Sequence, residues 1–246
     1  MRVSRVSMLL FAALAAVVLA PSGTHARGLL QAQVCVLPAT VAPTSQVLVG
    51  GSITTPIAAK VRPTSSTTFS GSFAIVFPAP CPTAATLAAA LPKAYIATVK
   101  GSPGVSLADT KAVVTMGTPP TVVANVLVGG LKGTTLSAVG PAGVAAPTVT
   151  ATAGTVTTTN SVVPIKPYSL AGQSMLIAGT GCTLGATGAT VTFSCPKLSV
   201  AQTLNLDVGS GVKGGGSLAI QGSLTATGKL SDAKLVPAST VPAPKA

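Results

Sequence analysis

Hydrophobic and polar residues alternate along the stretch SLAIQGSLTATG, which begins at Ser217, and this pattern constrains the fold more than any other feature of the chain. One face carries Leu218, Ile220, Gly222, Leu224 and Ala226. The other face carries Ser, Ala, Gln and Thr. A period of two over this length is typical of a β-strand with one buried and one wet face. The stretch therefore predicts a sheet that covers a core on one side.

The composition extends this prediction to the whole chain. Hydrophobic residues make up 48% of the sequence and charged residues 7%, and there is no Glu and no Trp. Val, Thr and other strand-forming residues are abundant, whereas charged helix formers are nearly absent. The hydrophobic content is too high for a disordered chain. Many short strands separated by Gly and Pro predict an all-β fold of β-sandwich units.

The N-terminus has the pattern of a secretory signal peptide. Arg2 and Arg5 precede the short apolar run Met8–Ala20. Thr24-His25-Ala26 offers a cleavage site after Ala26, with cleavage after Ala20 as a second choice. We expect residues 1–26 to be removed, which predicts a secreted protein that stays extracellular or at the cell wall or surface. The run is too short to cross a bilayer, and no later stretch predicts a transmembrane segment. Cleavage also removes His25, the only histidine, and lowers the formal charge from +12 to +10.

Four cysteines remain in the mature chain, and an even number in a secreted protein predicts two disulfides. Three connectivities are possible. We favour Cys35–Cys81 and Cys182–Cys195, one in each half of the chain. A zinc site is the alternative, but no Cys-x-x-Cys pair and no histidine support it.

Proline placement suggests the domain organisation. Thr118-Pro119-Pro120 interrupts the strand pattern, because proline cannot donate a hydrogen bond to a sheet. We expect a β-sandwich-like domain over residues 27–117 and a second over residues 118–235, so that two units stand in tandem. Residues 236–246 are rich in Pro and Ala and predict a disordered tail.

The segment Cys182–Gly209 resembles the closing strands of Ig-like repeats found on microbial cell-surface proteins. It has a cysteine, a Gly-rich turn, a strand that ends in a second cysteine, and a Ser/Ala-rich link to a further strand. The resemblance covers about 28 residues. It implies Ig-like sandwich units and an extracellular structural or adhesive role.

The residues that enzymes use for acid–base chemistry are scarce. The mature chain has neither histidine nor glutamate, and Asp109, Asp207 and Asp232 lie far apart in the sequence. The Gly-x-Gly-x-x-Gly match at residues 209–214 is followed by a predicted strand rather than the helix that a nucleotide site needs. The match at residues 231–234 to the Ser-x-x-Lys motif of serine acyl enzymes adjoins the predicted tail, whereas that motif needs a helical turn in a buried site. We therefore expect a protein that is not an enzyme and has no catalytic, cofactor or metal site.

The positive charge requires either a partner or a solvation role. The lysines are spread singly along the sequence, and aromatic residues, which nucleic-acid binding favours, are few. The charge predicts attraction to an acidic polysaccharide, with other matrix proteins as alternative partners and self-association also open. An equally simple interpretation is that the lysines keep the protein soluble and protect sheet edges.

Between Pro147 and Asn160, threonines recur at every second position in two runs, which Ala153-Gly154 separates. If Ala153-Gly154 formed a two-residue hairpin loop, two strands would place their hydroxyls on one exposed face as a grid. The array would comprise Thr148, Thr150, Thr152, Thr155, Thr157 and Thr159. Such a grid resembles the arrays of ice-binding proteins, although threonine is also ordinary on an exposed strand. O-glycosylation of Ser and Thr is a further alternative.

These features together predict a secreted, non-catalytic structural component of a cell wall, surface layer or extracellular matrix. The alternative is an adhesin or glycan-binding module for acidic polysaccharide. Ice binding through the Thr array is a more remote possibility.

Overall fold

A computed structural model of the chain describes residues 32–55, 58–100, 102, 104–136, 148–161, 165–180, 182–207 and 212–242. The expected signal peptide, residues 1–26, lies outside these ranges. Residues Ala32–Ala246 form one compact unit.

Most of the described chain is strand and its helical elements are short, which confirms the all-β prediction. The strands are β1 (Gln33–Val41), β2 (Gln46–Thr55), β3 (Ala59–Pro63), β4 (Thr67–Pro78), β5 (Tyr95–Ala97), β6 (Val105–Leu107), β7 (Thr110–Met116), β8 (Thr121–Leu136), β9 (Thr148–Thr159), β10 (Tyr168–Ser169), β11 (Ser174–Thr180), β12 (Thr183–Thr187), β13 (Thr190–Asp207), β14 (Lys213–Lys229) and β15 (Lys234–Pro237). The helical elements are short: α2 (Leu87–Ala90), η1 (Leu91–Lys93), η2 (Leu230–Asp232) and η3 (Ala238–Thr240).

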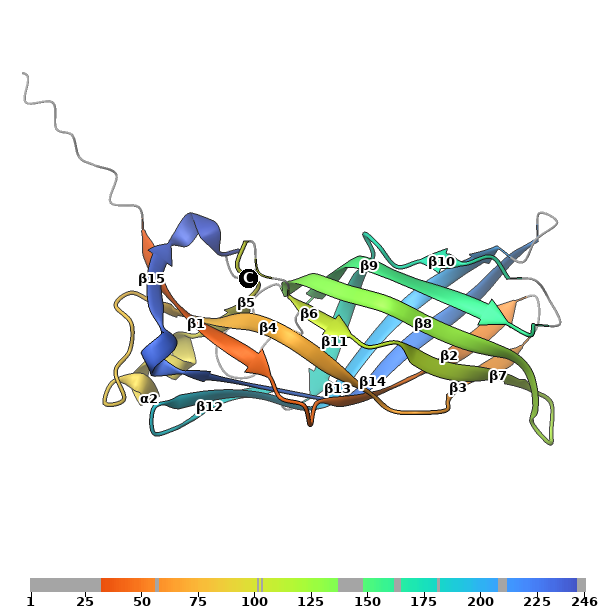
Figure 1. Cartoon of the computed structure of the whole chain (residues 1–246), viewed down its shortest axis with the longest axis horizontal. Helices are drawn as coiled ribbons and strands as arrows, with labels where there is room; N and C mark the ends of the chain where they lie inside the picture. Colours follow the sequence, from red (N-terminus) through yellow and green to blue (C-terminus); the bar gives the residue numbers. More distant parts are fainter. Residues whose placement is uncertain are drawn as a thin grey trace, which may run out of the picture. The chain divides into compact units, whose positions relative to one another are not determined.

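All of these strands belong to one antiparallel sheet, rather than to the two separate sheets of a sandwich (Figure 1). The sheet closes on itself, because β9 pairs with both β11 and β8. The closed path runs β9–β11–β13–β14–β2–β3–β7–β8 and back to β9. A second path closes through β1, β4 and β6 in place of β2, β3 and β7. Closure satisfies the backbone donors and acceptors along these strands and leaves few free edges.

One hydrophobic cluster fills the space that the closed sheet surrounds. It takes inward residues from β1, β2, β4, β7, β8, β9, β13 and β14, among them Leu37, Val49, Ile75 and Phe193. Phe73 and Phe193 meet edge to face with ring centroids 5.6 Å apart. Such a pair adds about 0.5–1.5 kcal/mol beyond its burial.

The β13–β14 ladder confirms the alternation in the sequence. It runs from Thr190 opposite Lys229 to Asp207 opposite Lys213, with an irregularity between Cys195 and Leu198. The inward side chains of β14 that the sequence placed on one face are almost fully buried: Leu218, Ile220, Leu224 and Ala226. The alternating apolar residues of the sequence therefore form the part of the core that β14 contributes.

The expected domain boundary falls in a hairpin turn. β7 and β8 pair with each other on the two sides of residues 117–120, with Met116 opposite Thr121. Strands from the two halves also pair elsewhere, as β14 does with β1 and β2. The sheet is thus continuous across the position where we expected tandem units to separate. A tight turn tolerates Pro119 and Pro120 as readily as a linker does, because neither position must donate to a ladder.

Residues 236–242, which belong to the segment expected to be a disordered tail, are ordered. Lys234–Pro237 form β15, which pairs with the first residues of β1. Val241 then folds over a second, smaller cluster on the other face of β1 and β4, made of Val36, Ala74, Val76 and Ala97. Tyr95 packs against this cluster, and its burial raises the pKa of the phenol above the ordinary value. The C-terminal segment is therefore ordered despite its Pro/Ala-rich composition, because it packs against an apolar surface.

Gly222 provides a test of how closely the strands approach one another. It stands opposite Val47, at the point where β14 leaves β2 and continues beside β1. A Cβ at Gly222 would meet the Gln46 carbonyl oxygen and would lie 2.7 Å from Val47 Cα, so backbone would have to move. We expect Gly222→Ala to lower the free energy of unfolding by about 1–3 kcal/mol in urea denaturation. Gly185→Ala, where a Cβ meets nothing within 4 Å, is the control and should change it by less than about 0.5 kcal/mol.

The covering by the C-terminal segment predicts a coupled change in stability and titration. Ending the chain after Pro237 removes Val241, and we expect a loss of about 1.5–3 kcal/mol of unfolding free energy. The pKa of Tyr95 should fall toward its ordinary value, as followed by ultraviolet titration in a Tyr168→Phe background. Because the folded-state pKa is raised, stability is full below pH 10 and declines as pH rises through that pKa. A chain that ends after Pro242 is the control and should behave as the full chain does.

Candidate functional site

The pairing of β3 with β7 gathers three cations that are far apart in the sequence. Lys60 stands opposite Thr115, and Arg62 stands opposite Val113. Lys111 lies two residues from Val113 along β7, on the same face. All three cationic side chains are exposed, and they alternate with buried residues: Ala59, Ala112 and Val114. We call Lys60, Arg62 and Lys111 the basic face. Because the buried residues that alternate with these cations belong to the core, the basic face lies on the outer side of the closed sheet.

The spacing within the basic face follows from strand geometry. Residues two apart along a strand are separated by about 6.7 Å, and diagonal cross-strand neighbours by about 7–8 Å. Two unit charges about 7 Å apart in water repel by only about 0.6 kcal/mol, so the sheet tolerates this arrangement. Sequence reasoning described these cations as dispersed, since Arg62 and Lys111 are far apart in the chain and only the register between strands brings them together.

The polar neighbours of the basic face are held by hydrogen bonds or point to solvent. Ser52 stands opposite Lys60 on β2, and its Oγ lies 3.0 Å from Ser217 Oγ. Thr115 Oγ1 donates to the Lys60 carbonyl oxygen at 3.4 Å. Asn125 stands opposite Val113 on β8 and is exposed. Hydroxyl and amide groups thus flank the cations on both sides.

The predicted threonine hairpin is wrong, because β9 runs as one strand from Thr148 to Thr159. Gly154, with φ +143°, lies within the strand, not in a turn. The register with β8 shifts around it. The inward face therefore changes parity between the buried residues Ala151 and Val156. The sequence contained a signal for this irregularity. Ala151 and Val156 are an odd number of residues apart, so a regular strand could not bury both on one face.

Threonines on both sides of this irregularity nevertheless reach solvent. Thr152, Thr155 and Thr159 are exposed, Thr150 and Thr157 are half-buried, and the side chain of Thr148 lies outside the described part. Thr152 Oγ1 donates to the Lys132 carbonyl oxygen at 3.3 Å, and Thr157 Oγ1 to that of Leu127 at 3.5 Å. The hydroxyls form a single file along one strand, not a grid across two.

The three aspartates are placed in separate elements and have partners of their own. Asp109 Oδ1 accepts a hydrogen bond from the Gly130 N–H at 2.9 Å. Asp207 Oδ2 lies 2.8 Å from Lys166 Nζ in an exposed ion pair. Asp232 accepts a hydrogen bond from Ser231 Oγ at 3.1 Å. Tyr168, two residues after Lys166, is partly buried and packs against the core.

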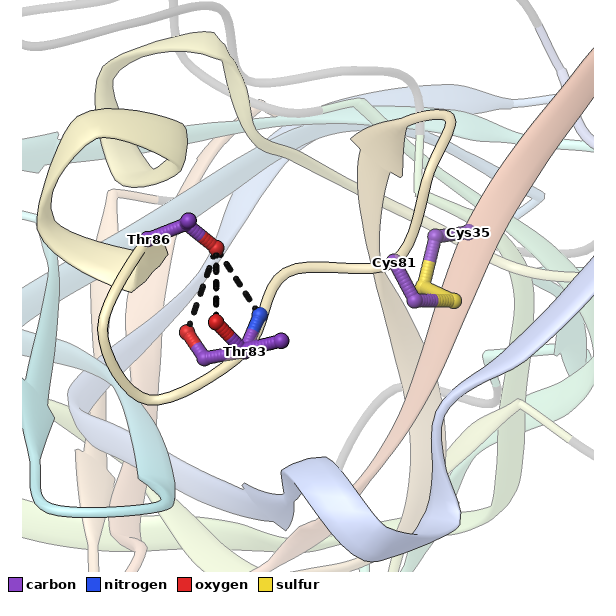
Figure 2. Close-up of a disulfide and its surroundings, with 4 residues drawn as sticks. All are labelled: Cys35, Cys81, Thr83 and Thr86. Carbon is purple, nitrogen blue, oxygen red and sulfur yellow. Dashed lines mark hydrogen bonds between the residues drawn. A yellow bond between two sulfur atoms is a disulfide. The ribbon is translucent and has the colours of Figure 1, made fainter.

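The cysteines form the two disulfides that the sequence favoured. Cys35 on β1 bonds Cys81, which follows β4, and Cys182 bonds Cys195 on β13. Figure 2 shows the first disulfide beside the turn that leads to α2. In that turn Thr86 Oγ1 accepts from the Thr83 N–H at 2.9 Å and lies within hydrogen-bond distance of the Thr83 hydroxyl and carbonyl oxygens. Disulfide bonding of all four cysteines replaces the alternative of a zinc site.

Within the described ranges, no group of three His, Cys, Asp or Glu side chains is arranged to hold a metal ion. No helix in the described part is long and apolar enough to cross a membrane.

Comparisons with family models, curated proteins and solved structures found no match to this chain.

The two disulfides should differ in how much they stabilise the protein. They close loops with sequence separations of 46 and 13 residues. In the chain-entropy model these loops correspond to about 4 and about 3 kcal/mol. We expect Cys35→Ala/Cys81→Ala to lower the free energy of unfolding by about 1 kcal/mol more than Cys182→Ala/Cys195→Ala, measured by guanidinium denaturation. A larger loss in the second variant would contradict the loop-length argument.

Proposed function

We propose that this protein is a secreted, non-catalytic structural component of a cell wall, surface layer or extracellular matrix. The observation that carries the proposal is a closed, core-filled sheet with two disulfides, one in each half of the chain. Disulfides persist in oxidising compartments, which supports a location outside the cytoplasm. A closed sheet whose interior is occupied by side chains leaves the outer surface as the part that meets partners.

The amino-acid inventory supports a non-catalytic role. General acid–base catalysis needs titratable groups that meet at one place. The mature chain has no histidine or glutamate, and the three aspartates have separate structural partners. The resemblance of Cys182–Gly209 to Ig-like surface repeats agrees with a structural or adhesive role.

A second candidate function is an adhesin or glycan-binding module for acidic polysaccharide. The observation that favours it is the basic face, since it concentrates positive charge on one part of the outer surface. The two functions are compatible, because a structural component of a matrix also binds other components of that matrix.

The structural role predicts where the native protein is found and in what covalent state. We expect it in the wall or matrix fraction of its source, beginning at Arg27, with a mass increase of four hydrogens when both disulfides are reduced. Intact mass spectrometry with and without reduction measures all of this. A ladder of sugar masses would add that Thr and Ser side chains carry glycans. An intact Met1 chain with free thiols in the cytoplasm would overturn the proposal.

A further inference from the structure

We propose that the basic face, Lys60, Arg62 and Lys111, binds the carboxylate groups of an acidic polysaccharide. The inference deepens the proposed function by naming the site and the ligand chemistry. It rests on that function only for the biological setting, because binding can be measured on the isolated protein.

The first argument is that the sheet does not neutralise these cations. Opposite charges placed across strands would stabilise the sheet, but the cross-strand neighbours here are uncharged. Lys60 lies between Ser52 and Thr115. Within the described chain, no ion pair involves the side chains of the basic face. Their charge is therefore available to a ligand.

Arg62 and Lys111 also have neutral neighbours. Arg62 faces Val113 on one side. On the other side, the β2 residue before Gly51 is Gly50, which has no side chain and where an added Cβ would crowd the Val61 carbonyl oxygen at 3.2 Å. Lys111 stands opposite Leu127, while its carbonyl oxygen accepts from Thr64 Oγ1 at 2.9 Å.

The second argument concerns the acidic residues. Asp207 is on β13, which does not pair with β3 or β7, and Asp232 is in η2. Asp109 is the carboxylate nearest in sequence, two residues before Lys111, and its Oδ1 is engaged by the Gly130 N–H. The basic face therefore keeps a net positive charge even when Asp109 is included.

The third argument identifies the ligand chemistry. The guanidinium of Arg62 matches a carboxylate in a bidentate arrangement, and the two lysines add point charges within reach of one extended polymer. Ser52 and Asn125 offer groups that can hydrogen-bond sugar hydroxyls. Single-stranded nucleic acid would require aromatic side chains for stacking. The sequences of β3, β7 and β8 contain no aromatic residue.

The test uses the full disulfide-bonded protein and immobilised polygalacturonate, with binding followed by biolayer interferometry at several salt concentrations. The face variant is Lys60→Gln/Arg62→Gln/Lys111→Gln. The matched control is Lys93→Gln/Lys197→Gln/Lys229→Gln, which removes the same charge from exposed positions on three other elements. Neutral dextran and single-stranded DNA are the ligand controls.

We expect the wild type to bind polygalacturonate but not dextran, with affinity that falls as salt rises. The face variant should lose about tenfold or more in affinity, and the control variant less than about threefold. Arg62→Lys keeps the charge but loses the bidentate hydrogen bonding of the guanidinium group, and should weaken binding by about threefold or more. This single variant also keeps the test valid if the triple variant fails to fold.

Equal losses in the two triple variants would overturn the proposal, because net charge alone would then explain binding. Absence of binding to polygalacturonate, or tighter binding to DNA, would overturn it as well. These outcomes are separate from the location of the native protein. A protein that binds in vitro yet resides in the cytoplasm would refute the structural role and leave the site intact.

Discussion

The pairing of β8 with β9 closes the sheet, because it joins the two strands that would otherwise be its edges around the core. Without it, both strands would present a long row of unpaired backbone groups and the core would open along one side. Closure makes the inner and outer faces distinct over the whole sheet. Each residue of a regular strand is then either part of the core or part of the outer surface, and its parity along the strand decides which.

That division explains how a protein of low charge can carry a concentrated basic surface. Lys60, Arg62 and Lys111 occupy outward positions because their neighbours Ala59, Ala112 and Val114 fill the core. Since β3 and β7 are antiparallel, outward positions of one stand beside outward positions of the other. The disulfides and the C-terminal segment act elsewhere, on β1, β13 and the second cluster. The residues that stabilise the fold through disulfides and the second cluster are thus different from the residues of the basic face.

The differences between expectation and structure have local causes. The alternation along β14 predicted its buried face correctly, because a regular strand needs no information beyond its own period. The prediction for the threonine segment of β9 was wrong, because Gly154 lies at a register shift within a strand and not in the turn that Ala153-Gly154 suggested. Pro119 and Pro120 likewise marked a hairpin rather than a boundary. Glycine and proline report that the backbone changes direction or pairing, but not which of several changes occurs.

Composition and period were enough to predict the all-β class and the buried side of the most regular strand, and the distribution of the cysteines favoured one of three possible disulfide pairings. These properties depend on composition, cysteine spacing and period, which are local. Three features became visible only in the folded protein: all strands join one closed sheet, Val241 joins the second cluster, and Arg62 and Lys111 become neighbours. The reason is that strand pairing is set between residues distant in the chain. Many pairings satisfy the same local pattern, and burial of the whole core selects one of them.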